Sequence, residues 1–542
     1  YCFSLSAQDF DSSYEDSYIE KRTVQPKKFF EIGELASNYS LSNMLENKTF
    51  EQINKFYKSL PTNNKNSAID KLVYNVLVSK INLEAKNFSP NQDKQIFEIR
   101  ISKLFEMGKF EDIDNFYSQM PMNSESETLN KKRIEAYLLR NEFKNACKLH
   151  QKLTVKKSYE WGKLEIICNM VNQNFEKARF SLSLLKEFNF PGDTLFIDLA
   201  YKIIGDIEIS DEEIYNRNLG ELKTLTPVLL SSMQIAEISP SFENIKNSPI
   251  NQLIFILSSP SSSTEVKLYC AERLVRLKRI KPQMLAEVYQ LSNFSNEEVE
   301  NVLELYKTFS PVRSRALIYQ AIIIETDPKI KFKLIQLLLN QSKKENLFKP
   351  MAILLKNSLD YSNYESSDEI EKALILDILL SNSQYSEAKD YIETNKGLSV
   401  IYNKKVFLDL LMIIDDEQVK NGEINQSVTP SILLSNFPKK FIENFLILES
   451  FIKDNEYQNQ ASDTNSFKLD GDIDLLDFIF IMNDRNEKKD FKLFGFLIKI
   501  VKGKDIQNLN NLDIFVILKI IQYFAYDDVF KDISKDILFS QI

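Results

Sequence analysis

The chain has 542 residues, of which 43% are hydrophobic and 27% charged, enough for several domain-sized cores. Its 11 glycines and 15 prolines are too few for a protein built from many short strands and tight turns, so the composition predicts an all-α protein. The net charge of −9 comes from 68 basic and 77 acidic residues mixed along the chain. No basic stripe is visible, which disfavours nucleic-acid binding.

The first seven residues have the character of an export-signal remnant. They are apolar and end in small residues, which predicts cleavage after Ala7. A fragment boundary and a lipid attached to Cys2 are the alternatives. Residues 8–27 are polar and lack a period, so we expect a disordered lead-in. An exported chain would lie in the bacterial periplasm, with the cytoplasm as the alternative, and no apolar window is long enough to span a membrane.

A self-match marks the N-terminal half. Phe50–Pro61 recurs as Phe110–Pro121, with apolar positions matching apolar ones throughout. A similar aromatic residue opens a helical pattern at Phe143, Phe175 and Tyr385. The second, third and fourth of these five markers are 33 and 32 residues apart, which is the period of a two-helix unit.

A predicted helix precedes each of the last four markers. Its apolar stripe begins nine residues upstream of the aromatic, at Ile101, Ile134, Ile166 and Leu376. The helix breaks at a small or polar residue, namely Gly108, Asn141, Gln173 and Ser383. A hairpin of two such helices cannot bury its own apolar face, so we expect successive hairpins to stack.

The pattern resembles the tetratricopeptide class. The resemblance rests on the turn at Gly108–Phe110 and covers about residues 30–190 and 370–395. It departs from the class at Ile53 and Ile113, where a small residue belongs. Elsewhere that small residue is present as Ala146, Ala178 and Ala388. The resemblance implies an α-solenoid of stacked helix hairpins without substantial β-sheet, which binds protein partners.

We divide the chain into four regions. Residues 1–27 are the signal remnant and lead-in, 28–200 the tetratricopeptide-like repeats, 201–400 a helical repeat middle region, and 401–542 a C-terminal helical region. In the middle region Thr226 is the predicted N-cap of a helix that starts with proline. The turn signature is not recognisable after about residue 220.

The middle region is also similar to an uncharacterised group of exported helical proteins of alphaproteobacteria. The matching motifs are Thr226–Pro227, Ala271–Arg273 followed by Pro282 and Leu285–Tyr289, and Arg315–Leu317 with Tyr319–Ala321. This resemblance spans about residues 226–360. It implies export and a helical repeat fold, but no activity.

Near the C-terminus one predicted helix carries two distinct faces. The apolar face holds Phe491, Phe494, Leu497, Ile498 and Val501, and the basic face holds Lys492, Lys499 and Lys502. We interpret this as a core stripe with a solvated lysine face. The alternative is an amphipathic helix on an anionic membrane.

Three cysteines follow Cys2 in the chain. Cys147, Cys168 and Cys270 are an odd set, which argues against a full disulfide framework. We expect buried free thiols. A bridge between Cys147 and Cys168, on consecutive predicted helices, is the alternative.

The sequence offers few candidates for chemistry. It lacks phosphate-binding and dinucleotide-binding loops, and His150 is its one histidine, for which we expect a packing or surface role. Asp470–Asp474 alternates acids as a calcium loop does, but Leu475 and Ile481 replace the required Gly and Glu, so a helix-capping segment is preferred. Glu449–Phe451 resembles the Glu-Ser pair of lytic transglycosylases without the following Gly-rich stretch. We therefore predict no catalytic residue, metal ligand or cofactor-binding residue.

These observations favour a non-enzymatic helical-repeat scaffold or adaptor that binds a protein partner in the bacterial cell envelope. One alternative is an envelope enzyme acting on glycan or peptide through acids that no motif reveals. The other is a peripheral membrane protein.

Overall fold

The structure is a computed structural model in which part of the chain is described. The described residues are 29–34, 44–45, 48–64, 66–80, 88–120, 126–153, 160–188, 193–206, 210–218, 225–358, 369–395, 404–405, 407–408, 411–412, 414–415, 468–469, 473–474, 478, 489–501, 504, 509–524 and 527–539. The predicted signal remnant and lead-in, residues 1–27, lie outside these ranges.

The described elements are almost all helices. The first set is η1 (Phe29–Glu31), α2 (Phe50–Ser59), α3 (Ser67–Val78), α4 (Pro90–Glu106), α5 (Phe110–Ser118), α6 (Glu127–Leu139), α7 (Phe143–Lys152), α8 (Glu160–Val171), α9 (Phe175–Phe188), α10 (Thr194–Ile204) and α11 (Asp211–Arg217). The second set is α12 (Pro227–Ile235), α13 (Phe242–Ile245), α14 (Ile250–Ser258), α15 (Thr264–Arg276), α16 (Pro282–Gln290), α17 (Asn296–Glu300), α18 (Val302–Leu305), η3 (Tyr306–Thr308), α19 (Pro311–Ile324), α20 (Pro328–Lys343), α21 (Phe348–Leu354), α22 (Glu369–Ser381) and α23 (Tyr385–Thr394). The C-terminal set is α28 (Lys489–Val501), α29 (Asn511–Tyr523) and α30 (Asp527–Phe539).

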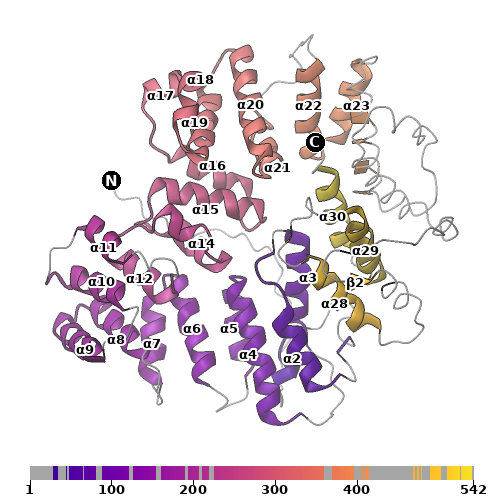
Figure 1. Cartoon of the computed structure of the whole chain (residues 1–542). Coiled ribbons are helices and arrows are strands. Elements are labelled where there is room, and N and C mark those ends of the chain that lie inside the picture. Colours follow the sequence, from indigo (N-terminus) through magenta and orange to yellow (C-terminus); the bar gives the residue numbers. More distant parts are fainter. Residues whose placement is uncertain are drawn as a thin grey trace, which may run out of the picture.

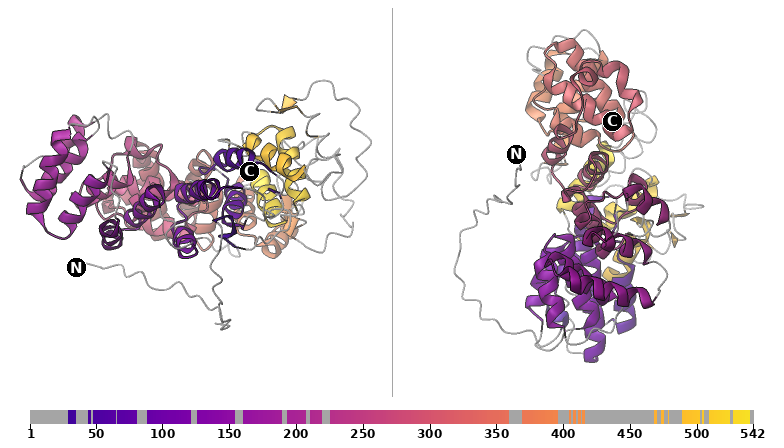
Figure 2. Two further views of the ribbon diagram at one scale, coloured as in Figure 1. Left: turned by 90° about the horizontal axis from the view of Figure 1, so that it is seen from below. Right: turned by 90° about the vertical axis from the view of Figure 1, so that its left-hand side faces the viewer.

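The predicted fold class is confirmed: the chain is an all-α solenoid in which consecutive helices pack against one another. Helices α4 to α10 form a row of antiparallel neighbours, part of which runs along the bottom of Figure 1. Two strands of two residues each, β1 (Lys468–Leu469) and β2 (Ile473–Asp474), form a small antiparallel hairpin. Two lobes, α2 to α11 and α16 to α23, are visible in the right-hand view of Figure 2.

The predicted helix breaks are confirmed at atomic level. Gly108, Asn141, Gln173 and Ser383 all have left-handed backbone, with φ between 56° and 71°. The next N–H then reaches back to the last turn of the helix, as from Glu142 N to the carbonyl oxygen of Tyr137 at 2.8 Å. This is the Schellman arrangement, which pairs backbone groups that a helix end would otherwise leave exposed.

The same turn recurs after Gln173, and it continues beyond residue 220, where the sequence did not reveal it. Left-handed residues follow at Gly205, Glu237, Lys278 and Asn346, each with the same back-reaching hydrogen bond from the next residue. From Gly108 to Glu237 the intervals are 33, 32, 32 and 32 residues. Glu and Lys have no special preference for this conformation, so side-chain identity concealed the repeat.

The chain then folds back along its own first row. Helix α12 packs against α10, α8 and α6, and α14 packs against α6 and α4. A Cβ at Gly108 would lie 3.3 Å from the side chain of Ile254 and 3.4 Å from Asn251, both on α14. The inner face of the first row is therefore filled by the chain itself, which hairpin stacking alone does not predict.

The C-terminal helices pack against α2 and α3, the first two α-helices of the described chain. On α2, the ring of Phe56 lies 5.3 Å from that of Phe491 and 5.7 Å from that of Phe494, both on α28. Helix α30 packs on α3, where Asp536 accepts a hydrogen bond from Asn66 at 2.9 Å. The same carboxylate lies 3.4 Å from Lys278 at the end of α15. Helix α30 thus connects the start of α3 to the end of α15.

Two of the three expected free thiols are instead paired, so that prediction is wrong for them. Cys147 on α7 and Cys168 on α8 form a disulfide, and their Cα atoms are 5.5 Å apart. The odd cysteine count was misleading because the third residue, Cys270, is buried and free, as expected. Direct packing of α7 on α8 supplies the close approach that a disulfide needs.

Helix α28 confirms the core-stripe interpretation. Phe494, Leu497 and Ile498 are buried, whereas Lys492 and Lys499 are exposed. An apolar face covered by protein is not available to lipid, so the membrane alternative for this helix is wrong. Within the described parts of the chain, none of the helices combines the length and apolar content that crossing a bilayer requires.

Candidate interaction surface

The five marker aromatics each begin a helix, and we call these five helices the outer helices: α2, α5, α7, α9 and α23. Their positions can therefore be compared one by one. The fourth residue of each is fully buried: Ile53, Ile113, Ala146, Ala178 and Ala388. Isoleucine thus occupies the same buried position as the alanine that the tetratricopeptide resemblance led us to expect.

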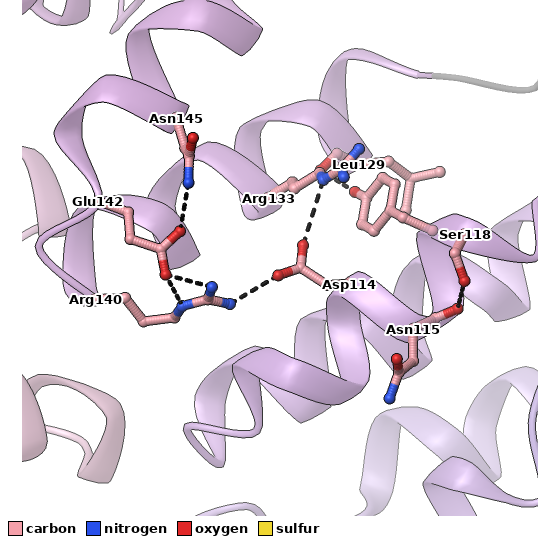
Figure 3. A network of polar contacts seen from close by, with 9 residues as sticks. Asp114, Asn115, Ser118, Leu129, Arg133, Arg140, Glu142 and Asn145 are labelled. Carbon is pink, nitrogen blue, oxygen red and sulfur yellow. Dashed lines mark hydrogen bonds and ion pairs between the residues drawn. The ribbon is translucent and has the colours of Figure 1, made fainter. Parts of the chain in front are cut away.

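The fifth residue of three consecutive outer helices joins its unit to the next. Asp114 on α5 accepts a hydrogen bond from Arg140 Nη1 at 2.7 Å, and Arg140 also pairs with Glu142 (Figure 3). In the next unit this position is Cys147, which forms the disulfide with Cys168. In the third unit, Arg179 forms an ion pair with Asp206, with Nη2 2.8 Å from Oδ1. The same structural position therefore forms the link between units in all three cases, twice through an ion pair and once through a disulfide.

The outer face of α9 differs from those of the other outer helices. The sixth residue is exposed in all five and is polar in four of them, as Lys55, Asn115, Lys148 and Asp390. The tenth is likewise polar in those four, as Ser59, Gln119, Lys152 and Thr394. On α9 these positions hold Phe180, 66% exposed, and Leu184, 41% exposed. Because the two side chains are four residues apart, they lie together on one face.

This pair stands out in the sequence only when the repeats are aligned with one another. Phe180 and Leu184 fit an ordinary apolar helical pattern, so the sequence alone reads them as core. Helices α12 and α14 cover the inner face of the row, whereas Phe180 and Leu184 are exposed. We take Phe180 and Leu184 as the candidate interaction surface.

The single histidine is a packed side chain. His150 is buried on α7, with its ring centroid 5.7 Å from that of Trp161 on α8. Burial raises the pKa of the Cys270 thiol to about 12, so this cysteine stays protonated near neutral pH and is a poor nucleophile. In the ranges that the structure describes, no group of three or more His, Cys, Asp or Glu side chains is arranged to hold a metal ion.

Two sequence candidates fall largely outside the described residues. Glu449–Phe451 lies wholly outside them. Of the alternating acids at 470–474, the structure describes Asp474, whose backbone pairs with Lys468 in the β1–β2 hairpin. That strand pairing does not agree with a helix-capping segment at this point.

A titratable cluster lies where α3, α5 and the turn after α15 meet. The Tyr74 hydroxyl donates to Asp112 at 3.1 Å, and Lys109 Nζ lies 4.7 Å from the centre of the Tyr74 ring. Burial, followed by the nearby Arg279, lowers the pKa of Lys109. Arg279 itself forms an ion pair with Asp70. The cluster connects three separate parts of the chain, so we assign it a structural role.

A buried polar network joins α15, α16 and α19. The Tyr289 hydroxyl donates to Glu272 Oε1 at 2.7 Å, and Arg315 Nε donates to the same oxygen at 2.8 Å. Gln320 adds hydrogen bonds to the carbonyl oxygens of Tyr289 at 2.6 Å and Ser292 at 2.7 Å. These hydrogen bonds join three helices in the interior, so we assign the network a structural role.

No protein-family model, no curated protein and no solved structure matches this chain.

Proposed function

We propose that the chain is a non-enzymatic helical-repeat scaffold that binds a protein partner through the outer face of α9. The observation that carries this proposal is the exposed pair Phe180 and Leu184, at positions where four equivalent helices are polar. Apolar side chains that interrupt a polar surface are typical of protein-binding sites. The kinship with tetratricopeptide proteins and with the exported alphaproteobacterial group belongs to the same proposal.

The proposal is tested by making α9 resemble α7. The double variant Phe180→Lys and Leu184→Lys places on α9 the residues that α7 has at Lys148 and Lys152. Both sites are exposed, so we expect the free energy of unfolding to stay within about 0.5 kcal/mol of the parent. We expect the partner to be recovered at least about tenfold less in quantitative affinity purification from the producing cells.

A control for this experiment is Lys144→Ser on α7, which changes an exposed residue of an equivalent outer helix. It should recover the partner as the parent does. If the α9 variant and the control recover the same proteins in the same amounts, the outer face of α9 is not the binding surface.

We further propose that the chain works in the periplasm. The Cys147–Cys168 bridge supports this location, because disulfides persist in oxidising compartments and are rare in the cytosol. The test is to alkylate free thiols in the native cells without reductant and then to map the peptides of the chain. We expect Cys147 and Cys168 to be recovered in one disulfide-linked peptide pair. Alkylated thiols at both positions would count against the location.

A further inference from the structure

Residues 29–34 precede the helix stack and lie against the end of α3 and against α4. The side chains of Phe29, Phe30 and Ile32 are buried there, and Ile32 has no exposed surface. The ring of Phe29 lies 5.0 Å from that of Phe97 on α4. We call residues 29–34 the N-terminal segment and the place that they occupy the segment site.

The N-terminal segment is held mainly through its backbone. Glu34 N–H donates to the carbonyl oxygen of Val78 at 2.9 Å, and Lys80 N–H donates to that of Glu34 at 2.8 Å, as between two strands. At the other end of the segment, Phe29 N–H donates to Asp93 Oδ2 at 2.7 Å. Backbone pairing of this kind is how many domains bind an extended peptide of another protein.

The end of α3, rather than the segment, sets the orientation of Arg100. Its Nε and Nη2 donate to the carbonyl oxygens of Leu77 and Ser79, at 2.8 and 2.9 Å, whereas Nη1 donates to that of Ile32 at 3.1 Å. The bonds to α3 and to the residue after it do not involve the segment. They keep Nη1 aimed at the place of the Ile32 carbonyl, so the segment site is preorganised for a peptide carbonyl.

Gly33 is the residue that the segment site restricts most strictly. Its φ of 136° is readily adopted by glycine and rarely by other residues. A Cβ at this position would lie 2.3 Å from the carbonyl oxygen of Val78 and 3.0 Å from Arg100 Nη2. Even alanine would therefore force the backbone of the segment away from α3.

We propose that the segment site is a peptide-binding site for an extended segment of a partner protein, with residues 29–34 as its built-in occupant. The ligand follows the pattern Phe-Phe-x-Ile-Gly, in which the three large apolar side chains are buried and glycine permits the backbone contact. A six-residue segment outside the helix stack opens at a lower cost than the whole fold, so the site is freed while the helices stay packed. This site is separate from the α9 surface and does not depend on it.

The test uses a fluorescent peptide of residues 27–36 and the full chain with Gly33→Ala, whose own segment no longer fits. In the parent chain the tethered segment competes at an effective concentration of about 1 mM. We therefore expect the Gly33→Ala chain to bind the peptide at least about tenfold more tightly than the parent does, as measured by fluorescence anisotropy. The same peptide with Gly33→Ala should bind neither chain.

The matched control is the full chain with Gly205→Ala. Gly205 also has left-handed backbone, but a Cβ there would meet nothing within 4 Å, so this chain should bind the peptide no better than the parent. Circular dichroism shows whether the Gly33→Ala chain is folded. If it is not, the full chain with Ile32→Ala weakens the built-in segment and leaves the site unchanged, and the same gain in peptide binding is expected.

Three results would overturn the proposal. The first is a folded variant chain that does not bind the peptide, and the second is equal binding of the parent peptide and its Gly33→Ala form. The third is a dimer of the parent chain that disappears with Gly33→Ala, because it would assign the segment site to a second copy of this chain rather than to a partner protein.

Discussion

Replacing Glu272 by alanine is expected to lower the free energy of unfolding by about 3 to 5 kcal/mol. Glu272 is buried and forms an ion pair with Arg315, which is buried as well, and it accepts the Tyr289 hydroxyl at 2.7 Å. Its removal leaves a guanidinium without a counter-charge and a hydroxyl without an acceptor. Urea unfolding followed by far-ultraviolet circular dichroism measures the loss.

The reason for that loss can be tested separately from its size. The cost lies in the charge left unpaired, so Glu272→Met combined with Arg315→Met should recover much of the stability. Glu287→Ala, at an exposed glutamate on α16, should change it by no more than about 0.5 kcal/mol. A double variant as unstable as the single one would show that packing, and not the unpaired charge, determines the loss.

Replacing Arg100 by methionine is expected to cost a similar amount, about 3 to 5 kcal/mol. Arg100 on α4 is fully buried and donates to the carbonyl oxygens of Leu77 at 2.8 Å, Ser79 at 2.9 Å and Ile32 at 3.1 Å. Its guanidinium carbon also lies 4.9 Å from the centre of the Phe116 ring. Methionine fills the space but leaves all three carbonyls unpaired in the interior.

The bonds from Arg100 hold the N-terminal segment against the end of α3, where Glu34 forms an isolated parallel bridge with Ser79. We therefore expect faster hydrogen exchange at the Glu34 and Lys80 amides, which bond across this bridge. The control is Arg140→Met, which breaks a partly exposed ion pair and should cost about 1 kcal/mol or less. If both arginine variants lost the same free energy of unfolding, the proposed role of Arg100 in holding the N-terminal segment against α3 would be contradicted.

Much of the local architecture was predictable from the sequence. The aromatic markers at Phe110, Phe143 and Phe175 are the first residues of α5, α7 and α9, and the residues proposed to break the preceding helices are the left-handed ones. Thr226 caps α12 as expected. These features depend on a few neighbouring residues, so a single sequence contains the information.

The features that escaped prediction depend on residues far apart in the chain. Helices α12 and α14 pack along the first row, and α30 packs on α3. Each of the surfaces that meet in this way looks like an ordinary apolar stripe in the sequence. The sequence could not decide whether Cys147 and Cys168 pair, because the pairing depends on how α7 packs on α8. The α9 surface required alignment of the repeats, since Phe180 is unusual only beside its four polar equivalents.

The central claim is that successive hairpins are copies of one unit stacked in one register, and moving the disulfide by one unit tests it directly. Cys147 is the fifth residue of α7, and Cys168 lies five residues before the left-handed Gln173. The equivalent pair one unit later is Arg179 and Ala200.

The measurement is the intact mass of the oxidised variant Arg179→Cys with Ala200→Cys after alkylation, beside a control in which Lys177→Cys replaces the change at Arg179. The account predicts that the first pair forms a second disulfide and that the control pair takes up two alkyl groups. Alkylation of both new cysteines in the first variant would contradict the shared register.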